Sequence, residues 1–278
     1  MVVKELKDVA YGPYERNMLD AYLVGSAENP SPVLLFMHGG GYVNGDKLTN
    51  LPAGLKKDCL EAGISFISAN YRFITNDPFP APMNDGTRAL QFIRHMAGEW
   101  NLDPSRLAAS GSSAGGHLLL WNTLKGNMAK SASADPVERE RSDVAAFVGF
   151  GTQVSKDQRF YEGIYEGPHI QPNLKLFYGL NSLDELYTPE VLKLMEEASA
   201  ITHLSEAAPP LLMNYNYPLD LPRIPAEAPV GEVIHHPMHG YVLKQKYDQM
   251  GKRFVLRHTL DPLQPKEEVQ FLLECFDM

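Results

Sequence analysis

The chain has 278 residues, of which 44% are hydrophobic and 21% are charged, and its net charge at pH 7 is −9. This length and composition are typical of one globular domain with a large core, and the acidic balance argues against nucleic acid and anionic membranes as partners. No apolar run is long enough to span a bilayer, and two cysteines, Cys59 and Cys275, are too few for a disulfide framework or a metal cluster.

The first eight residues carry acids and lack the apolar stretch of a signal peptide. The chain is therefore expected in the cytoplasm, or outside the cell if a signal peptide precedes this sequence in the natural protein. The sequence calls for no cofactor and no metal, and it leaves open whether the chain forms a homodimer.

Strand-like and helix-like segments alternate along the chain. Asn84 or Asp85 is expected to cap a helix whose apolar side chains recur at helical spacing. The apolar runs that predict strands lie at 33–37, 64–69, 107–110 and 144–150. This alternation predicts an α/β protein with a mostly parallel central sheet and flanking helices.

The segment Gly111-Ser112-Ser113-Ala114-Gly115 forms a G-x-S-x-G motif after the strand at 107–110. In this motif the chain turns sharply from strand to helix, so the central serine stands clear of the sheet and only small residues fit beside it. The helix that follows points backbone N–H groups at developing negative charge. Ser113 is therefore predicted as a nucleophile. A glycine-rich turn without chemistry is the alternative when the motif is read alone.

A glycine-rich loop, His38-Gly39-Gly40-Gly41, follows the strand at 33–37. The backbone amides of Gly40, Gly41 and Ala114 are predicted to form an oxyanion hole, because glycine lets the backbone approach a tetrahedral intermediate closely. His38 stands at the strand end, where it is expected to hold the loop by hydrogen bonds and not to act as a base.

These two motifs, HGGGY at 38–42 and GSSAGG at 111–116, resemble those of the bacterial hormone-sensitive-lipase-like esterases and of the related feruloyl and acetyl-xylan esterases. Further local similarities extend the resemblance over about residues 11–121. The resemblance implies an α/β-hydrolase fold and a serine carboxylesterase that acts on a small-molecule ester. The carboxy-terminal half departs from the family's motifs, and Ser112 stands where the family has an acidic residue.

The segment 151–205 interrupts the alternation of strands and helices. Within it, Thr188-Pro189 predicts the start of a helix that runs to about Ser199. We expect this insertion to form a partial cap over the acyl pocket, within a single domain of residues 1–278. Because the insertion is short and partly polar, small acyl esters are expected as substrates, and long-chain triglycerides are not.

The carboxy-terminal part should supply the remaining catalytic groups. Strands are predicted at 209–215 and 254–258, a proline-rich irregular loop at 216–236, and helices from Pro237 and Pro265. The hydrolase fold expects an acid after the next-to-last strand and a histidine after the last strand.

Asp220 lies in the proline-rich loop, near the expected place of the acid. His258 lies at the end of the last predicted strand, and no histidine follows it. The base is therefore His258, which we take first, or a histidine recruited from His235, His236 or His239, or it is absent. The second hypothesis for function is a hydrolase-fold protein with an eroded triad, which binds an ester-like or carbohydrate ligand without efficient turnover.

Overall fold

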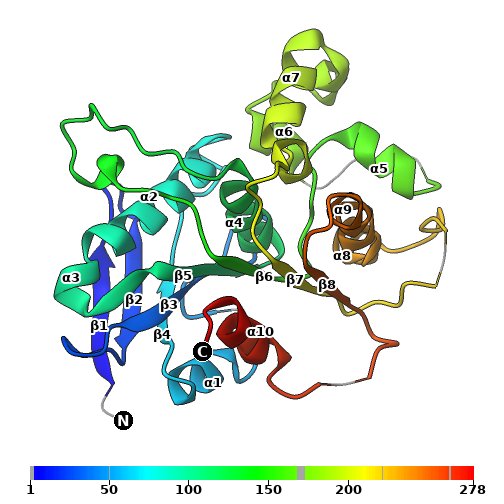
Figure 1. Ribbon diagram of the computed structural model, residues 1–278. Coiled ribbons are helices and arrows are strands. Elements are labelled where there is room, and N and C mark those ends of the chain that lie inside the picture. The colour runs from blue at the N-terminus through cyan, green and yellow to red at the C-terminus, as the bar shows by residue number, and fades with distance from the viewer. Residues whose placement is uncertain (1–2, 50, 168–172, 221, 263) are drawn as a thin grey trace.

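The computed structural model describes residues 3–49, 51–167, 173–220, 222–262 and 264–278. Within these ranges one sheet is built from the strands β1 (Lys4–Ala10), β2 (Met18–Leu23), β3 (Ser31–Met37), β4 (Ser65–Ala69), β5 (Leu102–Ser112), β6 (Ala146–Phe150), β7 (Leu211–Asn214) and β8 (Phe254–Arg257). Their spatial order is β1-β2-β4-β3-β5-β6-β7-β8 (Figure 1). The pairs β1–β2 and β2–β4 are antiparallel, and all pairs from β4 to β8 are parallel. The predicted mostly parallel sheet is confirmed.

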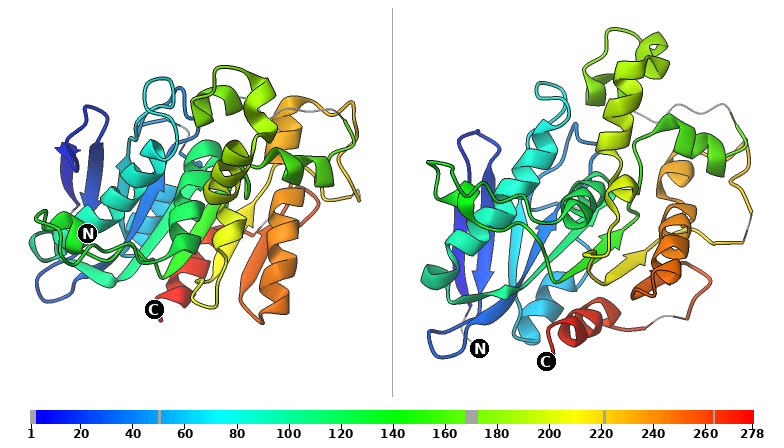
Figure 2. Two further views of the ribbon diagram at one scale, coloured as in Figure 1. Left: turned by 90° about the horizontal axis from the view of Figure 1, so that it is seen from above. Right: turned by 45° about the horizontal axis from the view of Figure 1, so that its top comes forward.

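Helices cover both faces of the sheet (Figures 1 and 2). They are α1 (Leu55–Glu61), α2 (Ala81–His95), α3 (Ala97–Trp100), α4 (Ser113–Lys125), α5 (Gln158–Ile164), α6 (Leu174–Tyr178), α7 (Pro189–Ala198), α8 (Val230–His235), α9 (Met238–Gln249) and α10 (Glu267–Cys275). Short 3-10 helices lie at Val137–Arg139, Leu183–Tyr187 and Ala200–His203. In the described ranges, no helix is both long and apolar enough to cross a membrane.

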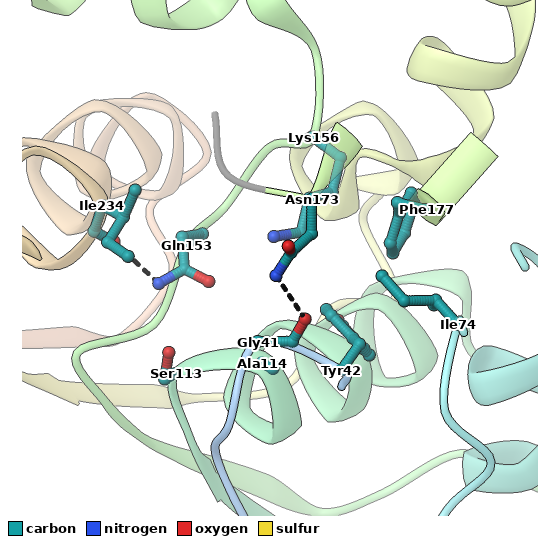
Figure 3. Close-up of a pocket in the computed structure, with 10 residues that line it drawn as sticks. All are labelled: Gly41, Tyr42, Ile74, Ser113, Ala114, Gln153, Lys156, Asn173, Phe177 and Ile234. Atoms are coloured by element: carbon teal, nitrogen blue, oxygen red, sulfur yellow. Dashed lines mark hydrogen bonds between the residues drawn. The ribbon is translucent and has the colours of Figure 1, made fainter. Parts of the chain in front are cut away.

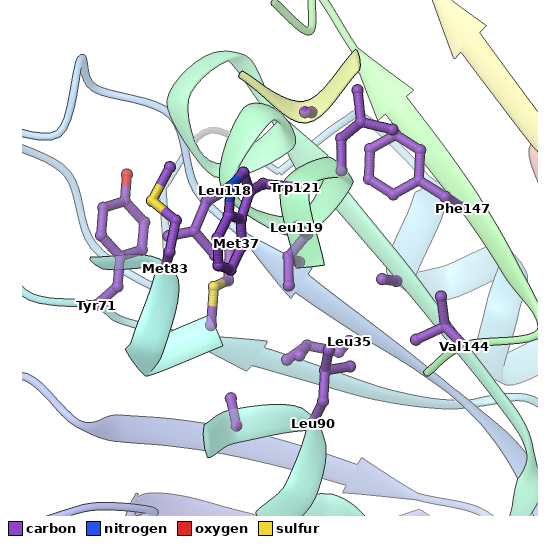
Figure 4. Close-up of a cluster of buried hydrophobic side chains, with 14 of the residues drawn as sticks. Leu35, Met37, Tyr71, Met83, Leu90, Leu118, Leu119, Trp121, Val144 and Phe147 are labelled. Carbon is purple, nitrogen blue, oxygen red and sulfur yellow. The ribbon is translucent and has the colours of Figure 1, made fainter. Parts of the chain in front are cut away.

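Strand β3 lies at the centre of the sheet, and every one of its residues is buried. Leu34 and Phe36 belong to the apolar cluster beneath α1 and α10. Leu35 and Met37 belong to the larger cluster on the other face, where α2 and α4 pack (Figure 4). Helix α9 packs on the same cluster. Successive side chains of a strand point to opposite faces, so a strand covered on both faces needs a continuous apolar run. Burying each such side chain contributes about 1.5–3 kcal/mol.

The start of α2 differs from the prediction. Asn84 and Asp85 were expected to cap this helix, but it begins at Ala81 after Pro80. The earlier start is possible because a proline is tolerated in the first helical turn, where the N–H has no partner. The Asp85 carboxylate instead accepts hydrogen bonds from the backbone N–H and the guanidinium of Arg72, both at 2.8 Å.

The segment 151–205 carries α5, α6 and α7, which lie beyond one end of the sheet (Figures 1 and 2). Helix α7 confirms the helix predicted from Thr188-Pro189. The proline-rich segment 216–236 is largely irregular, but its last residues form α8, which the sequence analysis did not anticipate. Val233 of α8 is fully buried against Tyr161 and Ile224, so α8 packs on the 151–205 segment.

Candidate active site

The turn between β5 and α4 has the geometry of a nucleophile elbow. β5 ends at Ser112, α4 begins at Ser113, and Ser113 has a φ of 50°. This left-handed conformation is unfavourable for a residue with a side chain. A Cβ on Gly115 would lie 2.3 Å from the carbonyl oxygens of Met37 and His38, so only glycine lets α4 approach the end of β3. The half-buried Ser113 side chain is thereby held at the carboxyl edge of the sheet.

The hydroxyl of Ser113 is paired with a histidine from α8. Ser113 Oγ lies 2.8 Å from His235 Nε2, and His235 Nδ1 lies 2.8 Å from the carbonyl oxygen of Gly231. A carbonyl can only accept a hydrogen bond, so Nδ1 carries the proton and Nε2 of the neutral ring is free to accept one. Burial lowers the pKa of His235, which favours this neutral form at neutral pH.

The structure therefore pairs Ser113 with His235, and not with His258, which the sequence analysis took first. His258 directly follows β8, where the chain turns back so that Asp261 N–H donates to the His258 carbonyl at 3.0 Å. The backbone N–H of His258 donates to the Asp261 carboxylate at 2.9 Å, and Nε2 lies 3.8 Å from the same group. This tight turn keeps the His258 ring with its own neighbour in the chain.

The other two candidate histidines make hydrogen bonds to the backbone. His236 is buried, and its Nδ1 accepts a hydrogen bond from the Met238 N–H at 3.1 Å. His239 is fully buried, and its Nε2 lies 3.2 Å from the carbonyl oxygen of Val233. Burial lowers the pKa of His239 to about 3, so this ring stays neutral.

The structure does not bring Asp220 to His235. Asp220 is exposed, and the charge that it carries acts on His236. Burial lowers the pKa of His236, and the charge of Asp220 opposes that shift. Among the described residues, the partner found for His235 Nδ1 is the Gly231 carbonyl, four residues earlier in α8.

The glycine-rich loop brings its free backbone donors beside the elbow. Gly40 and Gly41 have φ values of 118° and 62°, and in the described part of the chain no acceptor is found for either N–H. Ala114 is the second residue of α4, where the N–H has no partner within the helix. The loop is fixed by Asn173, whose side-chain amide donates to the Gly41 carbonyl at 3.2 Å.

His38 forms a hydrogen bond to the backbone of this loop, as expected from the sequence. It is fully buried, its Nδ1 lies 2.6 Å from the Gly39 carbonyl oxygen, and its ring stacks on Tyr71 at 4.6 Å. Burial lowers the pKa of His38, so the ring is neutral.

Two pockets meet at Ser113. The first encloses about 400 Å³ of empty space, open solvent at its mouth included, and its walls are Gly41, Tyr42, Ile74, Ser113, Ala114, Gln153, Lys156, Asn173, Phe177 and Ile234 (Figure 3). The second, of about 870 Å³, is lined by Gly39, Gly40, Ser112, Ser113, Phe150, Gly151, Asn214, Asn216, Tyr217 and His235. His, Cys, Asp and Glu side chains in the described ranges form no group of three that could hold a metal ion.

Several residues of the first pocket were not predicted from the sequence, notably Gln153, Lys156 and Asn173. The one available signal was position: residues 151–156 directly follow β6. Ligands of open α/β sheets bind beyond the carboxyl ends of the strands.

The chain is similar to known esterases in sequence and in fold. The model of the BD-FAE family matches residues 19–216. The protein named "Probable isoprenylcysteine alpha-carbonyl methylesterase ICMEL1" of Arabidopsis thaliana is 24% identical over 230 residues, which cover 80% of this chain and 46% of that protein. Carboxylesterase NlhH of Mycobacterium tuberculosis is 36% identical over 87 residues, which cover 31% of this chain and 27% of that protein.

Among solved structures, the "Truncated form of carbohydrate esterase from gut microbiota" superposes with a TM-score of 0.73. It is 18% identical and the match covers 99% of this chain and 97% of that one, which supports the fold. The chain spans less than half the length of the two curated relatives named above.

Proposed function

Because this chain belongs to the BD-FAE family, we propose that it is a carboxylic ester hydrolase with Ser113 as nucleophile and His235 as general base. The observation that carries the proposal is the 2.8 Å contact between Ser113 Oγ and His235 Nε2. A serine hydroxyl is a weak nucleophile until a neighbouring base takes its proton. The neutral ring of His235 is aligned to do so.

In the proposed reaction Ser113 Oγ attacks the ester carbonyl while His235 Nε2 takes the hydroxyl proton. The amides of Gly40, Gly41 and Ala114 then hold the negative oxygen of the tetrahedral intermediate. His235 returns the proton to the alcohol oxygen, the alcohol leaves, and an acyl group remains on Ser113. A water molecule attacks this acyl-enzyme in the same way and releases the acid.

The group that orients His235 differs from the carboxylate of a triad. The Gly231 carbonyl fixes the tautomer and the direction of the ring. It carries no full charge, so it stabilises the imidazolium of the transition state less than a carboxylate would. We therefore expect a dyad enzyme whose turnover is slower than that of a complete triad.

We also propose that its substrates are small acyl esters and that the 151–205 segment acts as a partial cap. The first pocket is small, and Phe177 of α6 forms part of its wall. The names of the relatives, a methylesterase and a carboxylesterase, agree with ester hydrolysis. The alternative of a binding protein with an eroded triad is not favoured, because Ser113 retains a paired imidazole and free backbone donors.

The test is hydrolysis of 4-nitrophenyl acetate by the wild type and by variants at three positions. Ser113→Ala and His235→Ala should each lower kcat by at least a hundredfold, because each removes one half of the dyad. His258→Ala is the matched histidine control and should retain activity within a few-fold. A fluorophosphonate probe should label the wild type once and leave Ser113→Ala unlabelled. Loss of activity in His258→Ala with retention in His235→Ala would contradict the assignment of the base.

A further inference from the structure

Lys156 lies in the first pocket, opposite the reacting serine. The residue is only 7% exposed and lines the cavity together with Ser113 and Ala114. In Figure 3 it reaches in from the upper side, next to Asn173, whereas Ser113 and Ala114 form the lower side. The proposed chemistry uses no part of this residue.

This buried ammonium lacks a carboxylate partner. Across the described residues no acidic oxygen lies within 4.0 Å of Lys156 Nζ, and the residues outside the described ranges include no aspartate or glutamate. The carboxylate of the adjacent Asp157 pairs instead with Arg159. It forms an ion pair with the guanidinium at 2.5 Å and accepts a hydrogen bond from the backbone N–H at 2.9 Å. Nζ contacts ring faces instead, 5.3 Å from the centroid of Tyr42 and 5.7 Å from that of Phe177.

A buried cation without a counter-ion destabilises the folded protein, because water solvated it in the unfolded chain. The aromatic faces of Tyr42 and Phe177 compensate only in part. Burial lowers the pKa of Lys156 to about 7, so at neutral pH the pocket can take up or release this one proton. An anion that entered the pocket would supply the missing partner and hold the lysine in its charged form.

We propose that Lys156 binds an anionic group at the far end of the acyl chain, so that the enzyme prefers half-esters of short dicarboxylic acids over neutral esters of the same size. This inference rests on the proposed function, which supplies the serine and the base. It adds the substrate class that the first pocket selects.

The two pockets can be assigned to the two parts of the ester from the position of His235. The base must return its proton to the alcohol oxygen, so the alcohol lies on the side of His235. His235 lines the second pocket and is not part of the first. The acyl chain therefore extends into the first pocket, where Ile234 and Phe177 offer apolar walls to its methylene groups and Lys156 meets its end.

The experiment compares each half-ester with a neutral ester of the same shape. Monoethyl succinate is paired with ethyl 4-methylpentanoate, and monoethyl glutarate with ethyl 5-methylhexanoate, in which an isopropyl group replaces the carboxylate. Ethanol release gives kcat/KM for each. The wild type should favour one half-ester over its neutral counterpart at least tenfold, which is the usual scale of one charge-assisted hydrogen bond.

Lys156→Met should reduce this ratio of kcat/KM values at least tenfold, and Lys156→Gln gives a second neutral variant should the first fold poorly. Lys175→Met is the matched control, because Lys175 is an exposed lysine on α6, the helix that carries Phe177. It should leave the ratio unchanged. A wild type that hydrolyses the neutral esters without preferring a half-ester would overturn the inference and leave the proposed function intact. An equal ratio of kcat/KM values in Lys156→Met and in the wild type would also overturn the inference and leave the proposed function intact.

If no ester is hydrolysed, the proposed function fails, and binding decides the inference separately. Calorimetric titration of succinate and glutarate into Ser113→Ala should show at least tenfold tighter binding than titration into Ser113→Ala/Lys156→Met. Equal binding by the two proteins would overturn the role of Lys156.

Discussion

The ionisation of His235 controls the proposed reaction, because only the neutral imidazole can accept the Ser113 proton. Burial lowers the pKa of His235, the hydrogen bond to Gly231 opposes this shift, and the nearby cation of Lys156 adds to the lowering. The charge of Lys156, which takes no part in the proposed chemistry, thus influences the base that does.

This coupling predicts the acid limb of the pH profile. The kcat/KM for 4-nitrophenyl acetate should fall as the pH drops through a midpoint below 6.5, the ordinary pKa of histidine. Lys156→Met removes a positive charge that disfavours the imidazolium, so the midpoint should move to higher pH. Lys175→Met, an exposed substitution of the same kind, should leave it in place. A midpoint above 6.5 in the wild type would contradict the assignment of His235 as a buried base.

At the scale of elements, one short helix carries the proposed base. Helix α8 has six residues, from Val230 to His235, and the bond that orients the imidazole lies within it. So short a helix is not stable by itself and depends on tertiary packing. Val233 provides that packing, since it is fully buried in the cluster with Tyr161 and Ile224.

Shortening Val233 should therefore lower catalytic turnover as well as global stability. Val233→Ala should lower kcat several-fold, because α8 loses the contact that fixes His235, and it should cost about 1–2 kcal/mol in the free energy of unfolding. Val191→Ala is the matched control: Val191 is also buried, but it lies in α7, which carries no proposed catalytic residue. Steady-state kinetics and urea unfolding measure the two effects. Equal loss of kcat in both variants would show that α8 has no special role.

Helix α8 also marks where prediction from the sequence ended. The central strands and the elbow were predictable, because β3 reads as a continuous apolar run and the residues around Ser113 are small. Helix α8 was not predictable, because Pro225 and Pro229 indicate a loop and a helix of six residues is too short to show a periodic pattern. His235 was only one of several alternatives, because the topology of the hydrolase fold directs attention to a histidine after the last strand. Apart from its position after β6, nothing in the sequence marked Lys156, since an unpaired charge is visible only once the chain is folded.

At the scale of the whole molecule, the parallel strands bring distant segments to one edge of the sheet. The glycine-rich loop follows β3, the elbow follows β5 and the segment with Lys156 follows β6. The rigid sheet therefore holds the serine, the free amides and the lysine in fixed relation, whereas α8 reaches them from outside the sheet (Figure 1). The buried lysine also makes the stability of the whole molecule depend on pH.

The proton of Lys156 causes that dependence. Lys156 has a pKa of about 7 in the folded protein and an ordinary value of 10.5, so between these values the unfolded chain binds more protons than the folded one. The penalty of burying the cation is therefore full below pH 7 and disappears as the pH rises towards 10, and it is on the order of a few kcal/mol. Between pH 7 and pH 10, the free energy of unfolding should therefore increase more in the wild type than in Lys156→Met.

The groups around Lys156 do not titrate in this window. Burial raises the pKa values of Tyr42 and Tyr178 well above 10, and it lowers those of His117, His235 and His239. Groups common to both proteins, such as the buried thiol of Cys59, cancel in the difference. Urea unfolding at pH 7 and at pH 10 measures that difference. If the free energies of unfolding of Lys156→Met and the wild type change by the same amount between the two pH values, Lys156 does not carry a buried, unpaired charge. Only such a charge would make the difference between the two proteins depend on pH.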